Sequence, residues 1–177
     1  MFRKEIVGKF EKVTFYQFKK DLTETNPVYK TVPDGVIKYI YDRIKLPCRA
    51  TSDSAGYDFH TPIRIELKPK QTITIPTGIC CEIREGWFLG MYPRSGLGFK
   101  YRLQLDNTIG IIDGDYYYAE NEGHIMAKIT NDSYEDKEVF LEFGDRFMQG
   151  VFQPYGLAID DNITMKGTRI GGFGSTG

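Results

Sequence analysis

From Pro62 onward the chain alternates short apolar segments with turn residues. The segments read PIRIEL, QTITIP, TGICCEI, WFLGMY, NTIGII, GHIMAKIT and KEVFLEF, and a further one runs from Arg146 to Pro154. β-Branched and aromatic residues fill these segments, and Gly, Pro, Asn and Asp fill the gaps, which is the pattern of strands joined by turns. Because no helical periodicity intervenes, the pattern predicts an all-β fold of the sandwich or barrel type.

The two ends of the chain have a different character. In residues 1–45, FEKVTFYQF fits either a strand or an irregular segment anchored by its aromatic residues, and TNPVYKTVPDG has the composition of a loop. We expect this N-terminal extension to pack on a main β domain of residues 46–166. Residues 167–177 form a glycine-rich arm that cannot build a core of its own, so a ligand or a neighbouring subunit would have to hold it.

The composition narrows the classes of partner. The 177 residues suffice for one domain, and 23 basic residues against 24 acidic ones give a net charge of −1. This balance predicts no general attraction to nucleic acid or to a membrane. The N-terminus has no apolar run of signal-peptide or membrane-spanning length, and Cys48, Cys80 and Cys81 form neither a disulfide framework nor a zinc spacing. We therefore expect a cytoplasmic protein with reduced cysteines.

Two early motifs carry candidate site residues. SAGYDF places Asp58 in a glycine-flanked step before a strand, which taken alone is an ordinary turn aspartate. YPRSGLGFK gathers Arg94, Ser95 and Gly96 in a predicted tight turn. Backbone amides, a hydroxyl and a guanidinium suit phosphate oxygens, although a polar loop with a solvated arginine would look the same.

The segment LDNTIGIIDGDYYY carries the candidate base. Asp113 and Gly114 follow an apolar run, and an Asp-Gly pair in that place predicts a hairpin. We expect the neighbouring Ile111 and Ile112 to desolvate the carboxylate partly, which would make it a better base towards water. The alternative is an ordinary Asp-Gly turn with tyrosines packed across strands.

Two further motifs complete the candidate chemistry. In FGDRFMQGVFQPY, Arg146 and Gln149 interrupt an apolar segment, and buried side chains of this kind need partners. We expect Arg146 to have a structural partner, while Gln149 could have a structural or a bound one. The arm GGFGSTG offers exposed amides, hydroxyls and one ring, which suit phosphate groups and a stacked base.

Taken in order, AGYDF, PRSGLG, GIIDGDY, GDRFMQ and GGFGSTG resemble the five motifs of the trimeric dUTPase family. The resemblance covers residues 46–177. It implies a jelly-roll-like β subunit in a homotrimer, with active sites at subunit interfaces and the C-terminal arm closing over a neighbour's site. It also implies hydrolysis of dUTP to dUMP and pyrophosphate with Mg²⁺, which limits uracil in DNA and supplies dUMP.

The resemblance also implies roles for individual residues. Asp113 would activate the water that attacks the α-phosphorus, and Asp58 would position hydrated Mg²⁺ through water. Asn107, Gly110 and the main chain around Ile112 would read uracil, and Tyr116 would lie under the deoxyribose and exclude a 2′-hydroxyl. The other implied substrate contacts come from Arg94, Ser95, Gly96, Gln149, Arg169, Phe173, Gly174, Ser175 and Thr176.

Three departures from the family pattern leave questions open. Arg169 lies one residue closer to Gly-Gly-Phe than in many members, residues 117–122 replace a shorter turn, and residues 1–45 exceed a minimal family core. A rival enzyme class is dCTP deaminase, which shares the fold but uses a glutamate to activate water, and no glutamate precedes Glu120 in the predicted hairpin. A non-enzymatic rival is a regulatory protein whose partner surface is gated by a nucleotide.

Overall fold

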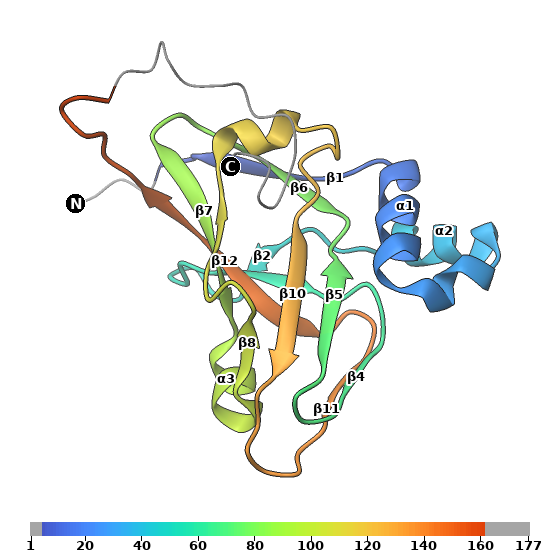
Figure 1. The fold of residues 1–177 in the computed structure, drawn as a ribbon. Helices are drawn as coiled ribbons and strands as arrows, with labels where there is room; N and C mark the ends of the chain where they lie inside the picture. Colours follow the sequence, from blue (N-terminus) through green and yellow to red (C-terminus); the bar gives the residue numbers. More distant parts are fainter. Residues whose placement is uncertain (1–4, 162–177) are drawn as a thin grey trace.

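A computed structural model describes residues 5–161 and shows mostly β-structure with a few helices (Figure 1). The strands are β1 (Gly8–Lys12), β2 (Cys48–Arg49), β3 (Tyr57–His60), β4 (Ile65–Leu67), β5 (Thr72–Pro76), β6 (Ile79–Ile83), β7 (Trp87–Pro93), β8 (Leu103–Leu105), β9 (Gly110–Ile112), β10 (Met126–Asn131), β11 (Val139–Leu141) and β12 (Arg146–Pro154). The α-helices are α1 (Phe15–Thr25), α2 (Asp34–Asp42) and α3 (Ser95–Tyr101), and the 3₁₀ helices are η1 (Pro27–Thr31) and η2 (Gly114–Tyr118).

The strands pair antiparallel in four small sheets. The largest has the order β2-β3-β12-β7-β9, and the others are β5-β10-β8, β1-β6 and β11-β4. Within residues 5–161 these sheets do not close into a barrel. The predicted all-β class is confirmed in its coarser form, because the structure is mostly β with a few helices that were not predicted, and the jelly-roll form stays a prediction.

The alternating segments from Pro62 onward form strands as predicted. Each of the eight segments contains one strand, from β4 to β12 with the exception of β8. The short strands β2, β3 and β8 were not predicted. Asp58 was predicted to lie in a turn before a strand, but it is a residue of strand β3 itself.

The N-terminal region combines one strand with two helices (Figure 1). Strand β1 pairs with β6, and α1 begins after Thr14, whose side chain accepts a hydrogen bond from the Gln17 N–H at 3.2 Å. The prediction of a loop over TNPVYKTVPDG is wrong, because most of these residues form η1 and the start of α2. Pro27 is the first residue of η1 and Pro33 is the N-cap of α2, and at both places the missing proline N–H costs no helical hydrogen bond.

The core collects side chains from both the sheets and the N-terminal helices. Phe18 and Leu22, four residues apart on α1, are completely buried, as is Ile37 of α2. Cys80 and Cys81 are free thiols on β6, and both are buried. Burial raises the pKa of Cys80 to about 11 and that of Cys81 to about 12, so both behave as small apolar side chains at neutral pH.

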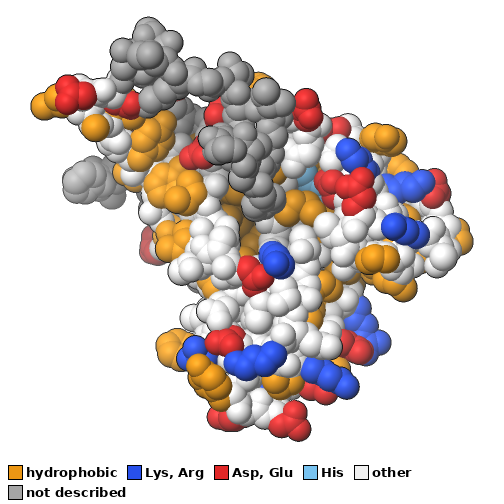
Figure 2. Space-filling view, viewed as in Figure 1, with side chains coloured by type: hydrophobic (Ala, Val, Ile, Leu, Met, Phe, Trp, Pro, Cys, Tyr) orange, Lys and Arg blue, Asp and Glu red, His pale blue; other side chains and the backbone are white. Residues whose placement is uncertain are grey.

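The surface mixes charges of both signs. Figure 2 shows acidic and basic side chains interspersed, with no single-sign field over the face in view. Over residues 5–161, no helix has the length and apolar character needed to cross a bilayer.

Candidate active site

Strand β12 brings three of the predicted motifs together. Gln149 on β12 lies opposite Asp58 on β3 and opposite Tyr92 on β7. Arg94 follows directly after β7, whose last residue Pro93 pairs with β12 as well. These motif residues are far apart in the sequence, and they lie close together because their strands are neighbours in the same sheet.

Asp58 is held between two guanidinium groups. Its Oδ1 lies 3.1 Å from Arg94 Nε, and its Oδ2 lies 3.2 Å from Arg146 Nη1. The Asp58 side chain is only 11% exposed, and a carboxylate that is this far removed from water needs such partners. Arg146 thus has the structural partner that its place in an apolar strand predicted, and Arg94 is oriented by the same carboxylate.

The Arg94 depression is a hollow next to this cluster, with a volume of about 620 Å³. Arg94, Ser95 and Gln149 line it, and Phe99 at its border is 93% exposed. The tight turn predicted for PRSGLG is wrong, because Ser95 and Gly96 form the first turn of α3 with Arg94 as the capping residue. Three predicted phosphate-binding side chains therefore share one open surface.

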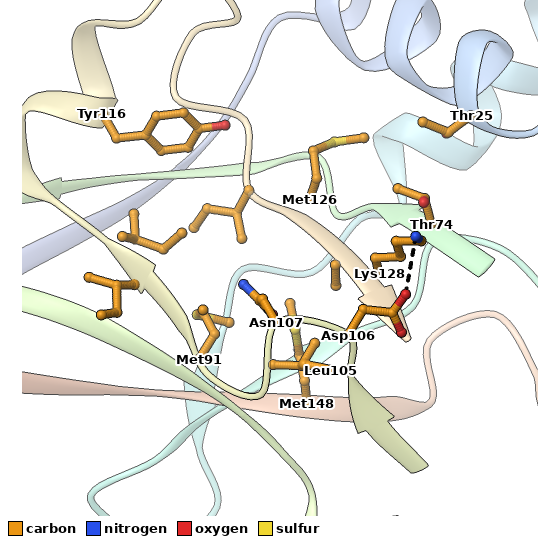
Figure 3. A pocket seen from close by; sticks show the side chains of 15 residues that line it. Thr25, Thr74, Met91, Leu105, Asp106, Asn107, Tyr116, Met126, Lys128 and Met148 are labelled. Carbon is orange, nitrogen blue, oxygen red and sulfur yellow. Dashed lines mark ion pairs between the residues drawn. The ribbon is translucent and has the colours of Figure 1, made fainter. Parts of the chain in front are cut away.

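The Tyr116 pocket is a second and more enclosed cavity of about 550 Å³ (Figure 3). Four of the residues predicted to bind the nucleoside line it, namely Asn107, Gly110, Ile112 and Tyr116. Most of the remaining lining is apolar and comes from β7, β8, β10 and β12, with an Asp106–Lys128 ion pair of 3.1 Å at one side. A mostly apolar cavity with a few polar groups suits a nucleoside.

Tyr116 is buried and hydrogen-bonded at its hydroxyl. Its exposed fraction is 2%, and it donates to the carbonyl oxygen of His124 at 2.7 Å while accepting from Asn121 Nδ2 at 2.8 Å. Because the hydroxyl is satisfied by protein groups, the ring has a fixed position in the pocket wall.

Asp113 lies between the pocket-lining strand β9 and η2. It is exposed in the single chain and has extended backbone angles (φ −81°, ψ 158°). The predicted Asp-Gly hairpin is wrong, since Gly114 begins η2 instead of turning into a new strand. The expected desolvation by both isoleucines is wrong for the single chain as well, because Ile111 is 58% exposed and only Ile112 is buried.

The two cavities have no lining residue in common. The residues predicted to bind the nucleoside and several of those predicted to bind phosphates therefore line two separate cavities of one chain. The predictions for the arm lie outside residues 5–161, and they concern Arg169, Phe173, Gly174, Ser175 and Thr176.

The carboxylates of the described residues determine how this site could hold Mg²⁺. Residues 5–161 hold no group of three or more His, Cys, Asp or Glu side chains that could form a metal cage. Both oxygens of Asp58 already face arginines. The described residues therefore fit only a cation that is held mainly by substrate phosphates and by water, which is how Mg²⁺ is commonly bound with nucleotides.

The N-terminal region contributes a pocket residue that the sequence did not predict. Thr25, the last residue of α1, lines the Tyr116 pocket (Figure 3). Its helix has a signal in the sequence, because Phe15, Phe18 and Leu22 follow helical spacing, but the preceding FEKVTF alternates like a strand and masks it.

Antiparallel sheets with one apolar pocket and one arginine-serine depression define a candidate nucleotide-binding β protein. A family model described as dUTPase matches residues 42–177. A deoxyuridine 5′-triphosphate nucleotidohydrolase of Lactococcus lactis subsp. lactis is 42% identical over 143 residues, which cover 80% of this chain and 94% of that protein. One from Desulfitobacterium hafniense is 38% identical over 139 residues, covering 75% and 87% respectively. The chain belongs to the dUTPase family.

Solved structures agree with this assignment. The dUTPase of Streptococcus mutans is 41% identical, with a TM-score of 0.57 over 64% of this chain and 88% of that chain. A dUTPase from phage phi11 of S. aureus has a TM-score of 0.55 at 22% identity over 67% and 88%, which shows the shared fold. The prediction of an enzyme of the dUTP diphosphatase class is confirmed, and neither rival reading is favoured by these relatives.

Proposed function

We propose that the chain hydrolyses dUTP to dUMP and pyrophosphate, and so limits uracil in DNA and supplies dUMP. The observation that carries the proposal is the division of the motif residues between two cavities. Asn107 and Tyr116 line the apolar pocket, whereas Arg94, Ser95 and Gln149 line the open depression. A nucleoside fits the first and a triphosphate fits the second.

The proposal includes a homotrimer. A nucleotide must contact both sets of residues at once, and one chain presents them on surfaces that share no residue. An interface that brings the Tyr116 pocket of one subunit beside the Arg94 depression of another would complete the site. The C-terminal arm, with Phe173 on the base and Arg169, Ser175 and Thr176 on phosphates, would close it.

The chemical step assigned to Asp113 is proton transfer. Its carboxylate accepts a proton from water as the water oxygen bonds to the α-phosphorus. The bond from that phosphorus to the bridging oxygen breaks, and pyrophosphate leaves with the electron pair. Arg94, Ser95 and Gln149 bind phosphate oxygens and hold the phosphorus in line with the water.

Mg²⁺ enters the proposal through the substrate. When bound with the substrate, Mg²⁺ would supply charge neutralisation at the phosphate oxygens. The Asp58 carboxylate, held by Arg94 and Arg146, would help to position the hydrated ion through water.

The decisive variant is Asp113→Asn. The amide cannot take the proton but keeps nearly the same shape, so dUTP binding is expected to persist while kcat falls by about 10²- to 10⁴-fold. Pyrophosphate release gives kcat, and calorimetry with a non-hydrolysable dUTP analogue gives affinity. Near-normal turnover in this variant removes Asp113 as the base.

Asp115→Asn is the matched control. Asp115 is an exposed carboxylate two residues away in η2, and its loss is expected to leave turnover within about twofold, as for surface substitutions generally. The unmodified enzyme is also given dCTP and assayed for ammonia. Ammonia release without pyrophosphate from dUTP would replace the proposal with the deaminase reading.

A further inference from the structure

The segment that follows Tyr116 is held by side chains of the N-terminal region. The Tyr117 hydroxyl donates to Glu11 Oε2 at 2.7 Å. The Glu122 carboxylate accepts from the Thr14 main-chain N–H at 2.6 Å and from the Thr14 hydroxyl at 2.7 Å. The end of β1 and the first turn of α1 are thus fastened to residues 117–122.

A third contact is buried. His124 is completely buried, and its Nδ1 lies 2.5 Å from Asp21 Oδ2 on α1, which also accepts from Gln17 Nε2 at 2.8 Å. The Gly78 N–H donates to His124 Nε2 at 2.7 Å, so the ring proton lies on Nδ1 and is donated to Asp21. Burial alone would raise the pKa of Asp21, but the hydrogen bonds from His124 and Gln17 lower it overall and keep the acceptor charged.

The same segment fixes the Tyr116 ring. The Tyr116 hydroxyl donates to the carbonyl of His124 and accepts from Asn121. Gly123 has a φ of +64°, and a Cβ there would lie 2.8 Å from the Tyr116 carbonyl oxygen and 2.7 Å from Tyr117 Cα. The turn therefore packs directly on the backbone that carries Tyr116, and any movement of the turn moves the ring.

Helix α1 also reaches the Tyr116 pocket itself. Thr25 lines it on a different side from Tyr116, as Figure 3 shows. Asn26, directly after the helix, donates through Nδ2 to the Thr74 carbonyl at 3.0 Å. The helix is therefore anchored both to the turn behind Tyr116 and to the strand on the far side of the same cavity.

We propose that residues 11–26 are a positioning element that holds Tyr116 in place and thereby sets the preference for deoxyribose over ribose. This inference rests on the proposed function, in which Tyr116 packs under the sugar. The four anchoring side chains, Glu11, Thr14, Asp21 and Asn26, precede residues 42–177, the stretch matched by the dUTPase family model. A 2′-hydroxyl is excluded sterically only by a ring that cannot yield, and the three contacts to residues 117–124 remove that freedom.

The test measures the ratio of kcat/KM for dUTP to kcat/KM for UTP. Asp21→Ala leaves the His124 N–H buried without its acceptor, so the turn is expected to shift. The ratio is then expected to fall about tenfold, which is less than the roughly 100-fold loss of rate that a 1 Å misplacement can cause. Asp21→Asn keeps an acceptor for His124 and is expected to hold the ratio within about twofold.

Asp34→Ala is the matched control. Asp34 also pairs with α1, through Lys19 at 2.6 Å, but this pair is exposed and does not touch residues 117–124. Its loss is expected to leave the ratio unchanged. A purely structural role for Asp21 would lower activity on both nucleotides equally, so an unchanged ratio in a folded Asp21→Ala protein overturns the proposal.

Thr14→Val provides a second route if Asp21→Ala fails to fold. It removes the hydroxyl that donates to Glu122 and accepts from the Gln17 N–H, while the main-chain donor to Glu122 stays. It is expected to lower the ratio in the same direction. An unchanged ratio in folded Thr14→Val likewise counts against the proposal. If the unmodified protein does not hydrolyse dUTP, the proposed function fails; if it does so selectively and both variants keep that selectivity, only this inference fails.

Discussion

At the scale of single residues, Gly56 shows how closely the motifs depend on one another. A Cβ on Gly56 would lie 2.4 Å from Gln149 Oε1 and 3.3 Å from its Cδ. The glycine of the first motif therefore leaves room for the side-chain end of the glutamine of the fourth, which lies on the neighbouring strand. The sequence displays both residues but not their contact.

Gly56→Ala is expected to displace the Gln149 side chain from the Arg94 depression. A lost hydrogen bond to a charged phosphate lowers kcat/KM for dUTP by about tenfold or more, with little change in the unfolding midpoint because the end of Gln149 is free to move. Gly35→Ala, where nothing lies within 4 Å of the added carbon, is the control. Unchanged kinetics in Gly56→Ala would show that Gln149 does not contact substrate.

At the scale of elements, the strands were predictable and the helices were not. Alternating β-branched residues mark the strands from β4 onward directly, because each strand has one buried face. Helix α1 instead begins at Phe15, only a few residues after strand β1 ends at Lys12. The alternating pattern of the strand therefore runs into the helical spacing of α1 and hides where the helix begins. The motifs predict candidate site residues one by one, but the Asp58 clamp and the anchors on residues 117–124 depend on contacts across the fold, which no motif displays.

The N-terminal helix is expected to unfold together with the β domain. Leu22 is completely buried, and Leu22→Ala should lower the free energy of unfolding by about 2–5 kcal/mol. Tyr16→Ala on the same helix removes a side chain that is 76% exposed and should change it by less than about 0.5 kcal/mol. Urea denaturation followed by circular dichroism measures both. A two-step curve for Leu22→Ala, with an unchanged second step, would mean that the helix folds independently.

At the scale of the whole molecule, the separation of the two cavities has a consequence for mixed assemblies. If each active site takes Asp113 from one subunit and Arg94 from another, subunits that carry Asp113→Asn and subunits that carry Arg94→Ala can complement each other. Random mixing in equal amounts would restore about a quarter of the sites, because each site needs one intact contribution from each type.

Co-expression of differently tagged subunits, followed by dUTP hydrolysis assays on the doubly purified mixture, measures this recovery. Double purification removes the unmixed assemblies, so the expected fraction of intact sites in the purified trimers rises to about a third. Each variant alone is expected to be nearly inactive, which provides the baseline. No recovery in verified mixed assemblies would place Asp113 and Arg94 in the same site within one chain.

The anchors between the N-terminal region and residues 117–124 also constrain the order in which the nascent protein can fold. Asp21 and His124 are 103 residues apart in the chain, and Thr14 and Glu122 are 108 apart. At a synthesis rate of about 5–20 residues per second, helix α1 waits roughly 5–20 s before its partners leave the ribosome. Throughout that interval Phe18 and Leu22 lack most of the surface that later covers them. The first helix to be synthesised is therefore among the last elements to pack in its final position.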